Sequence, residues 1–285
     1  MTPTNKTKCQ DLLRGLRSHP WRILTYSFAA FSVLWTLTDG ITHFLPGVKI
    51  EGGYALSLII LASIAYGLNR FWKPSRIVIK VATTNTKIEV LFGDLFAQNG
   101  LRGIGVTDFF ESELGSPVSE TSLHGLFLKK CFGGGATDFD RQIKEELKDI
   151  TFEQVVKSDG KKKRFPIGTT AEINVDDEKY IVFALAATDP ETCKAKSDVT
   201  KMWIALHSLW QRGRIEAGGH PLNVPLIGSG LSGIGLPSRD LLNLIILSAI
   251  TETKSNRITE VIRIVLHPDR FEEIDLRDVK KHWKE

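Results

Sequence analysis

The stretch Pro225-Leu226-Ile227-Gly228-Ser229-Gly230-Leu231-Ser232-Gly233-Ile234-Gly235 is the clearest sequence signal of the fold. It carries four glycines within eight residues. It lies between a predicted strand, Leu222–Ile227, and a predicted helix, Ser238–Ile250, where α/β sheets bind ligands. Glycine lets backbone amides point into a concavity, and the two serines add hydroxyl donors. Such a loop suits phosphate oxygens, because aligned donors replace the lost hydration of an anion. We therefore predict a phosphate-binding loop over Gly228–Ile234; the alternative is a glycine-rich strand exit that binds nothing.

The two best-known nucleotide motifs do not fit this loop. Gly228–Gly233 matches G-x-G-x-x-G, but a Rossmann site also needs an acidic residue about 20 positions further on, at the end of the next strand. Here that distance falls inside or just past the predicted helix, which argues against a dinucleotide fold. No Gly-Lys-Ser/Thr follows, so the loop is not a Walker A motif.

The region 75–285 alternates short β-rich runs with amphipathic segments. Strands are predicted at 76–81, 87–92, 102–106, 171–175, 180–187, 222–227 and 261–266, and helices at 123–132, 138–150, 198–215 and 238–250. The mixed order, with strand–helix alternation towards the end, predicts a three-layer α/β/α domain with a mixed sheet.

The charge of the chain is divided unevenly. Residues 1–80 carry ten Lys and Arg against three Asp and Glu, a net charge of +7, whereas residues 81–285 carry 27 against 30, a net charge of −3. A nucleic-acid binder would need a basic face on the folded domain, so no nucleic-acid partner is expected. The one basic run, Lys161–Arg164, follows Asp159-Gly160 and is predicted to be a solvated turn rather than a polyanion site.

Two long segments near the N-terminus lack charged residues. Sixteen uncharged residues run over Ile23–Thr38 and eighteen more over 52–69. A spanning helix needs about 20 apolar residues, so we predict a two-helix transmembrane hairpin over 23–72, after a cytoplasmic segment at 1–22. Small or polar residues suited to helix packing in lipid occur at Ser32, Ser57, Ala62, Ser63, Ala65 and Gly67.

Charge predicts the orientation of the hairpin. Basic residues flank it on both sides, at Lys6, Lys8, Arg14, Arg17, Arg22, Arg70, Lys73 and Arg76, while the connection between the segments holds only Lys49. The positive-inside rule then places both termini and the larger domain in the cytoplasm, at the bacterial inner membrane. The alternatives are a signal peptide, which leaves the second segment unexplained, and a buried hairpin of a soluble protein. Three separated cysteines without a C-x-x-C pair also fit a reducing compartment.

Three stretches resemble the macro domain, an ADP-ribose-binding module. Besides the glycine loop, Ile88-Glu89-Val90-Leu91-Phe92-Gly93-Asp94-Leu95 is similar to its early strand, and Phe165–Ala171 followed by Lys179–Phe183 is similar to its Pro-x-Gly turn and next strand. The resemblance covers about residues 76–270. It implies that Asp94, with Leu95, binds adenine, and that the diphosphate is held by Gly228, Ser229, Gly230, Leu231, Ser232, Gly233 and Ile234.

A macro domain behind a two-helix anchor further resembles the ThsA effectors of type II Thoeris anti-phage systems, which also carry a block like Gly105–Phe110 through Ser122–Gly125. This resemblance implies a partner TIR-domain enzyme that consumes NAD and releases an ADP-ribose derivative, a histidine conjugate in type II. The macro domain binds that molecule, and the membrane segments then damage the host envelope.

The chain departs from hydrolytic macro domains after the third predicted strand. Those carry an Asn-Ala-Ala-Asn segment, whereas here the sequence is Val106-Thr107-Asp108-Phe109-Phe110. Phe109 or Phe110 is predicted to stack on a ring or to close over the ligand. The resemblance also suggests ligand roles for other residues, with alternatives left open for Asp108 (a solvated loop carboxylate) and for Ser122 and His124 (a helix start with a surface histidine). These candidates are Val106, Thr107, Asp108, Ser122, His124 and Gly125.

We see no Ser-His-Asp arrangement, spaced carboxylate pair or metal-ligand cluster in the sequence, and expect no catalytic residue, metal or cofactor. The hypothesis is a ligand-gated effector that binds an ADP-ribose derivative, forms homo-oligomers and disrupts membrane lipid, leading to abortive infection. Two alternatives are a membrane-tethered ADP-ribosyl hydrolase and a passive anchor with a vestigial pocket.

Overall fold

The computed structural model describes residues 21–45, 47, 52–230 and 233–283. The chain separates into two compact units. The first comprises residues 1–75 together with Asp275–Arg277 and contains the two labelled N-terminal helices, and the second comprises the rest of the chain from Arg76 and contains the sheet. Each unit is described by itself.

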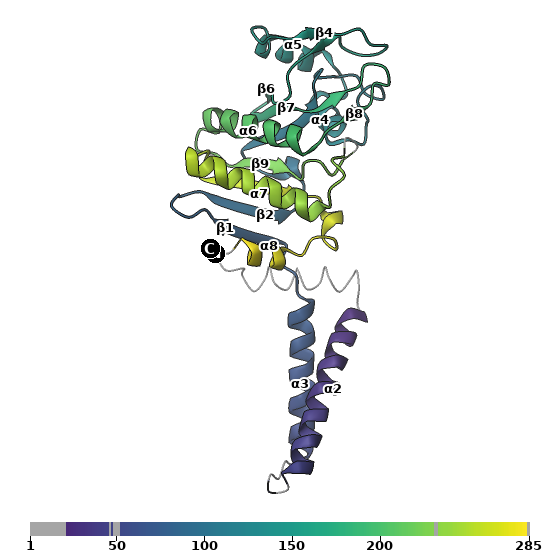
Figure 1. Cartoon of the computed structure of the whole chain (residues 1–285), viewed down its shortest axis with the longest axis vertical. Coiled ribbons are helices and arrows are strands. Elements are labelled where there is room, and N and C mark those ends of the chain that lie inside the picture. The colour runs from purple at the N-terminus through teal and green to yellow at the C-terminus, as the bar shows by residue number, and fades with distance from the viewer. Residues whose placement is uncertain (1–20, 46, 48–51, 231–232, 284–285) are drawn as a thin grey trace. The chain divides into compact units, whose positions relative to one another are not determined.

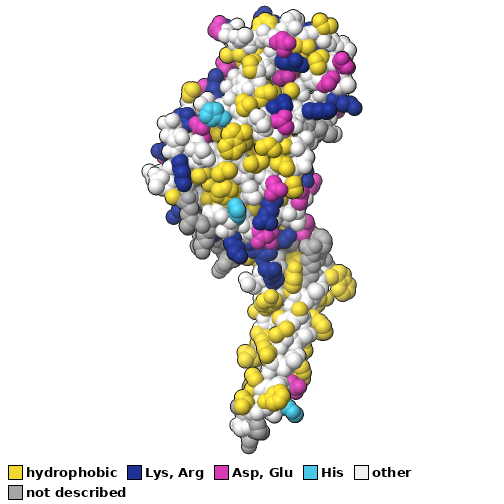
Figure 2. All heavy atoms as spheres, viewed as in Figure 1, with side chains coloured by type: hydrophobic (Ala, Val, Ile, Leu, Met, Phe, Trp, Pro, Cys, Tyr) yellow, Lys and Arg dark blue, Asp and Glu magenta, His cyan; other side chains and the backbone are white. Residues whose placement is uncertain are grey.

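Within the described residues, the helical unit contains the helices α2 (Trp21–Phe44) and α3 (Gly52–Phe71). The buried residues of α3 recur every fourth position, at Ile59, Ser63, Gly67 and Phe71. The Ser63 hydroxyl donates to the Ile59 carbonyl at 2.6 Å, so this polar group is satisfied within its own helix. The small residues Ser63 and Gly67 lie on the packed stripe, whereas Ser57, Ala62 and Ala65 are exposed. The remaining surface of the unit is lined with hydrophobic side chains (Figure 2).

Among the described helices, only α3 is long and apolar enough to cross a membrane. Helix α2 is longer, at 24 residues, but it contains Asp39 and several Ser and Thr residues. The prediction of two spanning helices is therefore supported for the second segment only. The basic residues Lys6, Lys8, Arg14 and Arg17, on which the predicted orientation rests in part, lie outside the described residues.

One sheet of eight strands organises the second unit, in the order β1-β2-β10-β9-β3-β7-β6, with β8 paired to β7 (Figure 1). The strands are β1 (Arg76–Lys80), β2 (Lys87–Phe92), β3 (Leu101–Thr107), β6 (Thr170–Val175), β7 (Glu178–Thr188), β8 (Ala195–Lys196), β9 (Leu222–Pro225) and β10 (Val261–Leu266). Strands β2, β10, β9, β3 and β7 run parallel, whereas β1 and β6 pair antiparallel to their neighbours.

Helices cover both faces of the sheet. Helices α4 (Leu123–Phe132) and α5 (Thr137–Glu146) contribute Phe127 and Phe139 to a buried cluster with Ile104 of β3. On the opposite face, α6 (Val199–Glu216) packs so closely that a Cβ on Gly103 would lie 3.2 Å from Leu209. Helix α7 (Ser238–Ser255) joins α6 through a hydrogen bond from the Trp210 indole to Ser248, at 3.1 Å. The predicted three-layer α/β/α domain with a mixed sheet is confirmed.

Most predicted element bounds agree with the structure, and β2, β10 and α4 agree to the residue. Helix α5 ends at Glu146 rather than Ile150, whereas α7 continues to Ser255, since Thr253 in its last turn is buried. Strand β9 ends at Pro225, two residues earlier than predicted, because proline has no amide hydrogen to continue the ladder. The short helix α8 (Leu276–His282) was not predicted.

The basic run at Lys161–Arg164 is not the predicted solvated turn. Lys163 and Arg164 form strand β5, which pairs with β4 (Glu153–Gln154). The Lys161 ammonium pairs with Asp140, and Arg164 pairs with Asp108 and Glu153. These acceptors come from other parts of the chain, so the charge pattern of the run alone does not reveal them.

We predict that Gly67→Leu separates α2 from α3. An added Cβ would overlap the Ser27 hydroxyl, and a larger side chain would push the two backbones apart. The expected loss in the free energy of unfolding is about 1–3 kcal/mol, measured by SDS titration of the full chain in mixed micelles. Ala65→Leu, on the exposed side of α3, is the control and should change little. Equal effects of the two substitutions would contradict the packing described here.

Candidate functional site

Parallel strands bring several loops to one edge of the sheet. Strands β2, β3, β9 and β10 all point the same way, so the segments that follow Phe92, Thr107, Pro225 and Leu266 lie along the same edge. This is the edge at which α/β sheets bind ligands. The predicted adenine residue Asp94 and the predicted phosphate loop are therefore brought to one side of the domain.

Two contacts fix the shape of the glycine loop. Gly228 has a φ of +85°, and a Cβ there would lie 2.6 Å from Ile234 Cδ1. The Ile234 amide donates to the Gly228 carbonyl at 3.1 Å, which closes the loop. The Ser229 hydroxyl donates back to the Leu226 carbonyl at 3.1 Å. Gly228 is thus required by both conformation and space, and Ser229 supports the loop rather than extending its hydroxyl from it.

Other groups of the loop remain available for a ligand. Among the described residues, no acceptor is bonded by the amides of Ser229, Gly230 and Gly233. A Cβ on Gly230 would meet nothing within 4 Å, so the space beside it is open. The N-terminus of α7 follows the loop, but its first amides are engaged: the Ser238 amide bonds the Glu273 carboxylate, and the Asp240 and Leu241 amides donate to the Pro237 carbonyl. Leu231 and Ser232, also predicted to bind the diphosphate, lie outside the described residues.

An arginine that sequence reasoning missed lies next to this loop. Arg270 belongs to the segment after β10, and its guanidinium Nη2 is 3.5 Å from the Ser229 carbonyl. Its Nη1 donates to Glu273 at 2.6 Å, which holds the side chain in place. The sequence feature that could have identified Arg270 is its position just after β10, a parallel strand that ends at the same edge of the sheet.

Asp94 lies at the start of a short 3-10 helix, η1 (Leu95–Ala97). Its carboxylate accepts from the Phe96 amide at 2.9 Å and from the Lys130 ammonium at 3.1 Å, and the side chain is half exposed. Burial alone would raise the pKa of Asp94, but the Phe96 amide and Lys130 outweigh it, and the pKa is lowered. Leu95 is buried in the core. Asp94 is thus ionised and accessible, as an acceptor for an adenine amino group must be.

Asp108 is not a solvent-facing ligand group in this structure. It is 2% exposed, and its carboxylate accepts from the Thr188 amide at 2.9 Å and pairs with Arg164 at 3.3 Å. Burial raises the pKa of Asp108. Val106 is buried in the core, and Thr107 is half-buried with no hydrogen-bond partner for its hydroxyl among the described residues. Of the three predicted positions, only Thr107 leaves a polar group unused.

Phe109 and Phe110 do not line a pocket, contrary to the stacking prediction. Both are fully buried. The Phe109 ring lies 4.0 Å from the Lys157 ammonium and 5.2 Å from the Arg164 guanidinium carbon. Phe110 has a φ of +49° and packs edge-on against Phe165, with ring centroids 5.6 Å apart. The two rings anchor the loop after β3 to the β4–β5 hairpin.

A desolvated ion pair strengthens the same anchor. The Glu111 carboxylate bonds the Lys157 ammonium, and the side chains are 2% and 0% exposed. The second Glu111 oxygen accepts from the Lys161 amide at 3.0 Å. A buried ion pair is stable only while both charges are present, because either charge alone would be buried without compensation. Glu111 and Lys157 therefore fix the loop and the hairpin to each other.

Ser122, His124 and Gly125 form the start of α4. Ser122 caps the helix by accepting from the Gly125 amide at 2.9 Å, and a Cβ on Gly125 would overlap the Ser119 carbonyl. His124 is 6% exposed, its ring lies 5.9 Å from that of Phe139, and its Nε2 has no hydrogen-bond partner among the described residues. Burial, with a smaller effect from Lys161, lowers the pKa of His124 to about 3. The imidazole is therefore a neutral core group, not the surface histidine of the alternative.

Within the described part of the chain, no three His, Cys, Asp or Glu side chains gather in a way that could hold a metal ion. The site is thus an edge of backbone donors with the exposed carboxylate of Asp94 and with the guanidinium of Arg270, which is paired with the partly exposed carboxylate of Glu273. Such an arrangement suits the binding of an anionic nucleotide-like molecule.

Comparison with known proteins agrees with this geometry. Residues 88–267 match the model of the family described as Thoeris protein ThsA, Macro domain, and the chain belongs to this family. Similar solved structures include the Oceanobacillus iheyensis macrodomain with ADP and the same macrodomain with MES bound. Each has a TM-score of 0.51 and 10% identity, and covers 73% of this chain and 96% of that chain. The likeness shows a shared fold. No curated protein matches the chain.

We predict that Lys157→Met destabilises the domain by about 3–5 kcal/mol, because it leaves the Glu111 carboxylate buried without its charged partner. Chemical denaturation of the full chain measures the effect. The double variant Glu111→Gln with Lys157→Met removes both charges and should recover a large part of the loss. Single and double variants of equal stability would contradict a coupled pair.

His124 makes stability depend on pH. Its pKa is about 3 when folded and about 6.5 when unfolded, so below pH 6.5 only the unfolded state takes up the proton. Its contribution is complete above pH 6.5 and falls as the pH is lowered, by about 2 kcal/mol at pH 5. His124→Leu should flatten the decline between pH 7.5 and 5 in thermal unfolding. His220→Gln, at an exposed position, is the control; an unchanged decline in His124→Leu would disprove this assignment.

Proposed function

We propose that this member of the ThsA macro domain family binds an NAD-derived ADP-ribose conjugate and acts as an effector of bacterial anti-phage defence. The observation that carries the proposal is the open space beside Gly230, in a loop whose Ser229, Gly230 and Gly233 amides bond no acceptor within the described part of the chain, on the same sheet edge as Asp94. The Oceanobacillus iheyensis macrodomain, which shares the fold, has been solved with ADP. A diphosphate needs several aligned donors, and this loop provides them.

In the proposed complex, the diphosphate lies on Gly228–Ile234 and the adenine lies near Asp94. The carboxylate of Asp94 accepts the adenine amino group, in competition with Lys130, which holds one of its oxygens at 3.1 Å. Arg270 adds a positive charge beside the phosphate loop. The far end of the ligand then lies towards the loop after β3, where the Thr107 hydroxyl is buried and has no hydrogen-bond partner among the described residues.

The response to the ligand is proposed to take place in the membrane. A TIR-domain enzyme supplies the signal, which we propose to be histidine-ADP-ribose, and the bound protein self-associates and disrupts the inner membrane, killing the infected cell. Helix α3 supports an anchor, and Arg70 in its last turn, with Lys73 and Arg76 after it, favours a cytoplasmic position for the macro domain. For the ligand to drive assembly, it must bind the assembled state more tightly than the resting state.

A membrane-tethered ADP-ribosyl hydrolase is the alternative function. It would need Asp108 or His124 to reach the ligand, but both side chains are buried and the Asp108 carboxylate is engaged by Thr188 and Arg164. We therefore propose a receptor without hydrolytic activity. Release of free ADP-ribose from a mono-ADP-ribosylated protein, lost in Asp108→Asn, would favour the hydrolase instead.

We predict that Gly230→Glu abolishes the binding of ADP-ribose, because the new carboxylate would occupy the space proposed for the phosphates. Titration calorimetry of the purified full chain with ADP-ribose should show a loss of affinity of at least about 100-fold, the size expected when like charges meet at a desolvated site. In cells that produce the signal, the same variant should no longer be toxic.

Gly230→Ala is the matched control, since a Cβ at this position meets nothing within 4 Å. It should bind ADP-ribose within a few-fold of the parent and remain toxic. Unchanged affinity of Gly230→Glu would overturn the placement of the diphosphate. Loss of binding in both variants would point to the backbone of the loop instead of the charge.

A further inference from the structure

The chain that follows β10 carries contacts of two different kinds. This stretch, residues 267–277, contains the 3-10 helix η2 (Pro268–Arg270) and is called the link segment below. Its residues up to Ile274 belong to the sheet unit, whereas Asp275–Arg277 belong to the same compact unit as α3. The link segment is therefore a short covalent connection between the two units.

The first part of the link segment contacts the glycine loop. Arg270 Nη2 lies 3.5 Å from the Ser229 carbonyl, and Arg270 Nη1 donates to the Glu273 carboxylate at 2.6 Å. Glu273 also accepts from Ser238 at the start of α7, and the bonds from Ser238 and Arg270 lower the pKa of Glu273. Glu273 thus joins Arg270 to the helix that follows the glycine loop and positions the guanidinium beside that loop.

The last part of the link segment holds the end of α3. Arg277 Nη1 donates to the Arg70 carbonyl at 3.0 Å. Arg70 lies in the last turn of α3, where carbonyl groups lack partners within the helix and a cation is stabilising. Asp275 orients Arg277 by accepting from its Nε at 3.0 Å and from its Nη2 at 2.6 Å. Asp275 and Arg277 together form a cap on the C-terminal end of α3.

An ordered turn joins these two parts. The Arg270 carbonyl accepts from the Glu273 amide at 3.1 Å and from the Ile274 amide at 3.0 Å. Ile274 is 2% exposed, so the turn is packed as well as hydrogen-bonded. The Arg270–Glu273 ion pair spans this turn, which ends one residue before Asp275. Loss of the pair would therefore loosen the stretch that positions the cap.

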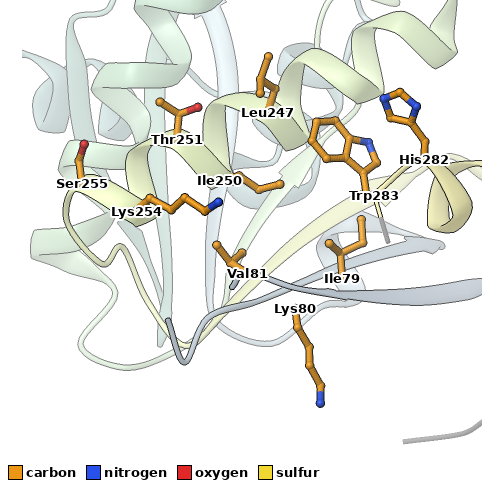
Figure 3. Close-up of a pocket in the computed structure, with 10 residues that line it drawn as sticks. All are labelled: Ile79, Lys80, Val81, Leu247, Ile250, Thr251, Lys254, Ser255, His282 and Trp283. Atoms are coloured by element: carbon orange, nitrogen blue, oxygen red, sulfur yellow. The ribbon is translucent and has the colours of Figure 1, made fainter. Parts of the chain in front are cut away.

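The far end of α8 is fixed to the sheet unit. Trp283, which follows α8, donates from its indole nitrogen to Asn243 of α7 at 3.0 Å. The Trp283 ring and Leu247 of α7 line the same cavity of about 580 Å³ (Figure 3). A change in the link segment is therefore taken up at the N-terminal end of α8, where Arg277 lies.

From these contacts we propose that the link segment releases the end of α3 when an anion binds the glycine loop. The inference rests on the proposed function and names the route by which the bound ligand acts. A diphosphate on the loop competes with Glu273 for the Arg270 guanidinium, because guanidinium–phosphate bonds are charge-assisted and often bidentate. Once Arg270 leaves Glu273, the turn loosens and Arg277 no longer holds α3. Arg270, with its two alternative partners, is the two-state element.

Hydrogen–deuterium exchange of the full chain in nanodiscs of phosphatidylethanolamine and phosphatidylglycerol tests this route. The probe is ADP-ribose, and titration calorimetry measures its binding to the same sample. The reporter is the peptide that contains 68–75, in which the Trp72 amide donates to the Leu68 carbonyl at 3.0 Å. Saturating ADP-ribose should raise the exchange rate of this peptide at least about five-fold, the lower end of common coupling between sites.

Variants of the cap test the reverse direction. Arg277→Met should raise the exchange of 68–75 without ADP-ribose and should tighten ADP-ribose binding about five-fold, because coupling between two sites is reciprocal. Asp275→Asn keeps Arg277 but removes the charge that orients it, and should act in the same direction to a smaller extent. Lys280→Met, at an exposed position of the same helix, is the control and should change neither quantity.

A variant at the other end of the turn completes the test. Glu273→Gln removes the charge that holds Arg270 and should raise the exchange of 68–75 without ADP-ribose. Glu260→Gln is the matched control, because it weakens another Arg–Glu pair of the same i,i+3 spacing, with Arg257, and should leave that exchange unchanged.

Each contrary result has a distinct meaning. Binding of ADP-ribose without a change in the exchange of 68–75 would overturn the route and leave the proposed function standing. ADP-ribose affinity of Arg277→Met equal to that of the parent would also overturn it. No binding of ADP-ribose by calorimetry would contradict the proposed function and the route together.

Discussion

Parallel pairing of five strands places every functional loop of this protein on one side. Hydrogen bonds between β2, β10, β9, β3 and β7 fix the direction of each strand, and the loops that follow them have no other edge to occupy. The glycine loop supplies amides there because Gly228 and Gly230 have no side chains, and Asp94 supplies a carboxylate because η1 begins at that point. The site is thus a product of the topology, with a few residues adding the chemistry.

The loop after β3 is held in place by buried charges. Asp108 is engaged by Thr188 and Arg164, and Glu111 is bonded by Lys157, a group with no exposed surface. Each charge is stable only while its partner remains, so the loop and the β4–β5 hairpin form one rigid element. The carboxylates of this loop are therefore committed to holding the fold.

The sequence was informative wherever structure depends on neighbouring residues. Periodicity located β2, α4 and β10, and the glycines located the loop between β9 and α7. The sequence did not reveal the environment of a side chain whose partner is distant in the chain. Phe109 contacts Lys157 and Arg164, some 50 residues away, and His124 is covered by Phe139 of another helix, so neither burial has a local signal. Arg270 was missed for the same reason, since only the register of β10 brings it to the glycine loop.

The central position of β10 in the sheet also affects when the domain can fold during translation. Lys87 of β2 pairs with Val261 of β10, 174 residues later, and β10 separates β2 from β9. Contacts between residues so far apart in sequence form late in folding, and the ribosome synthesises β10 after the other strands. A nascent chain therefore has its hydrophobic N-terminal helices long before it has the strand that joins β2 to β9, so the edge that carries the candidate site is incomplete until β10 has been synthesised.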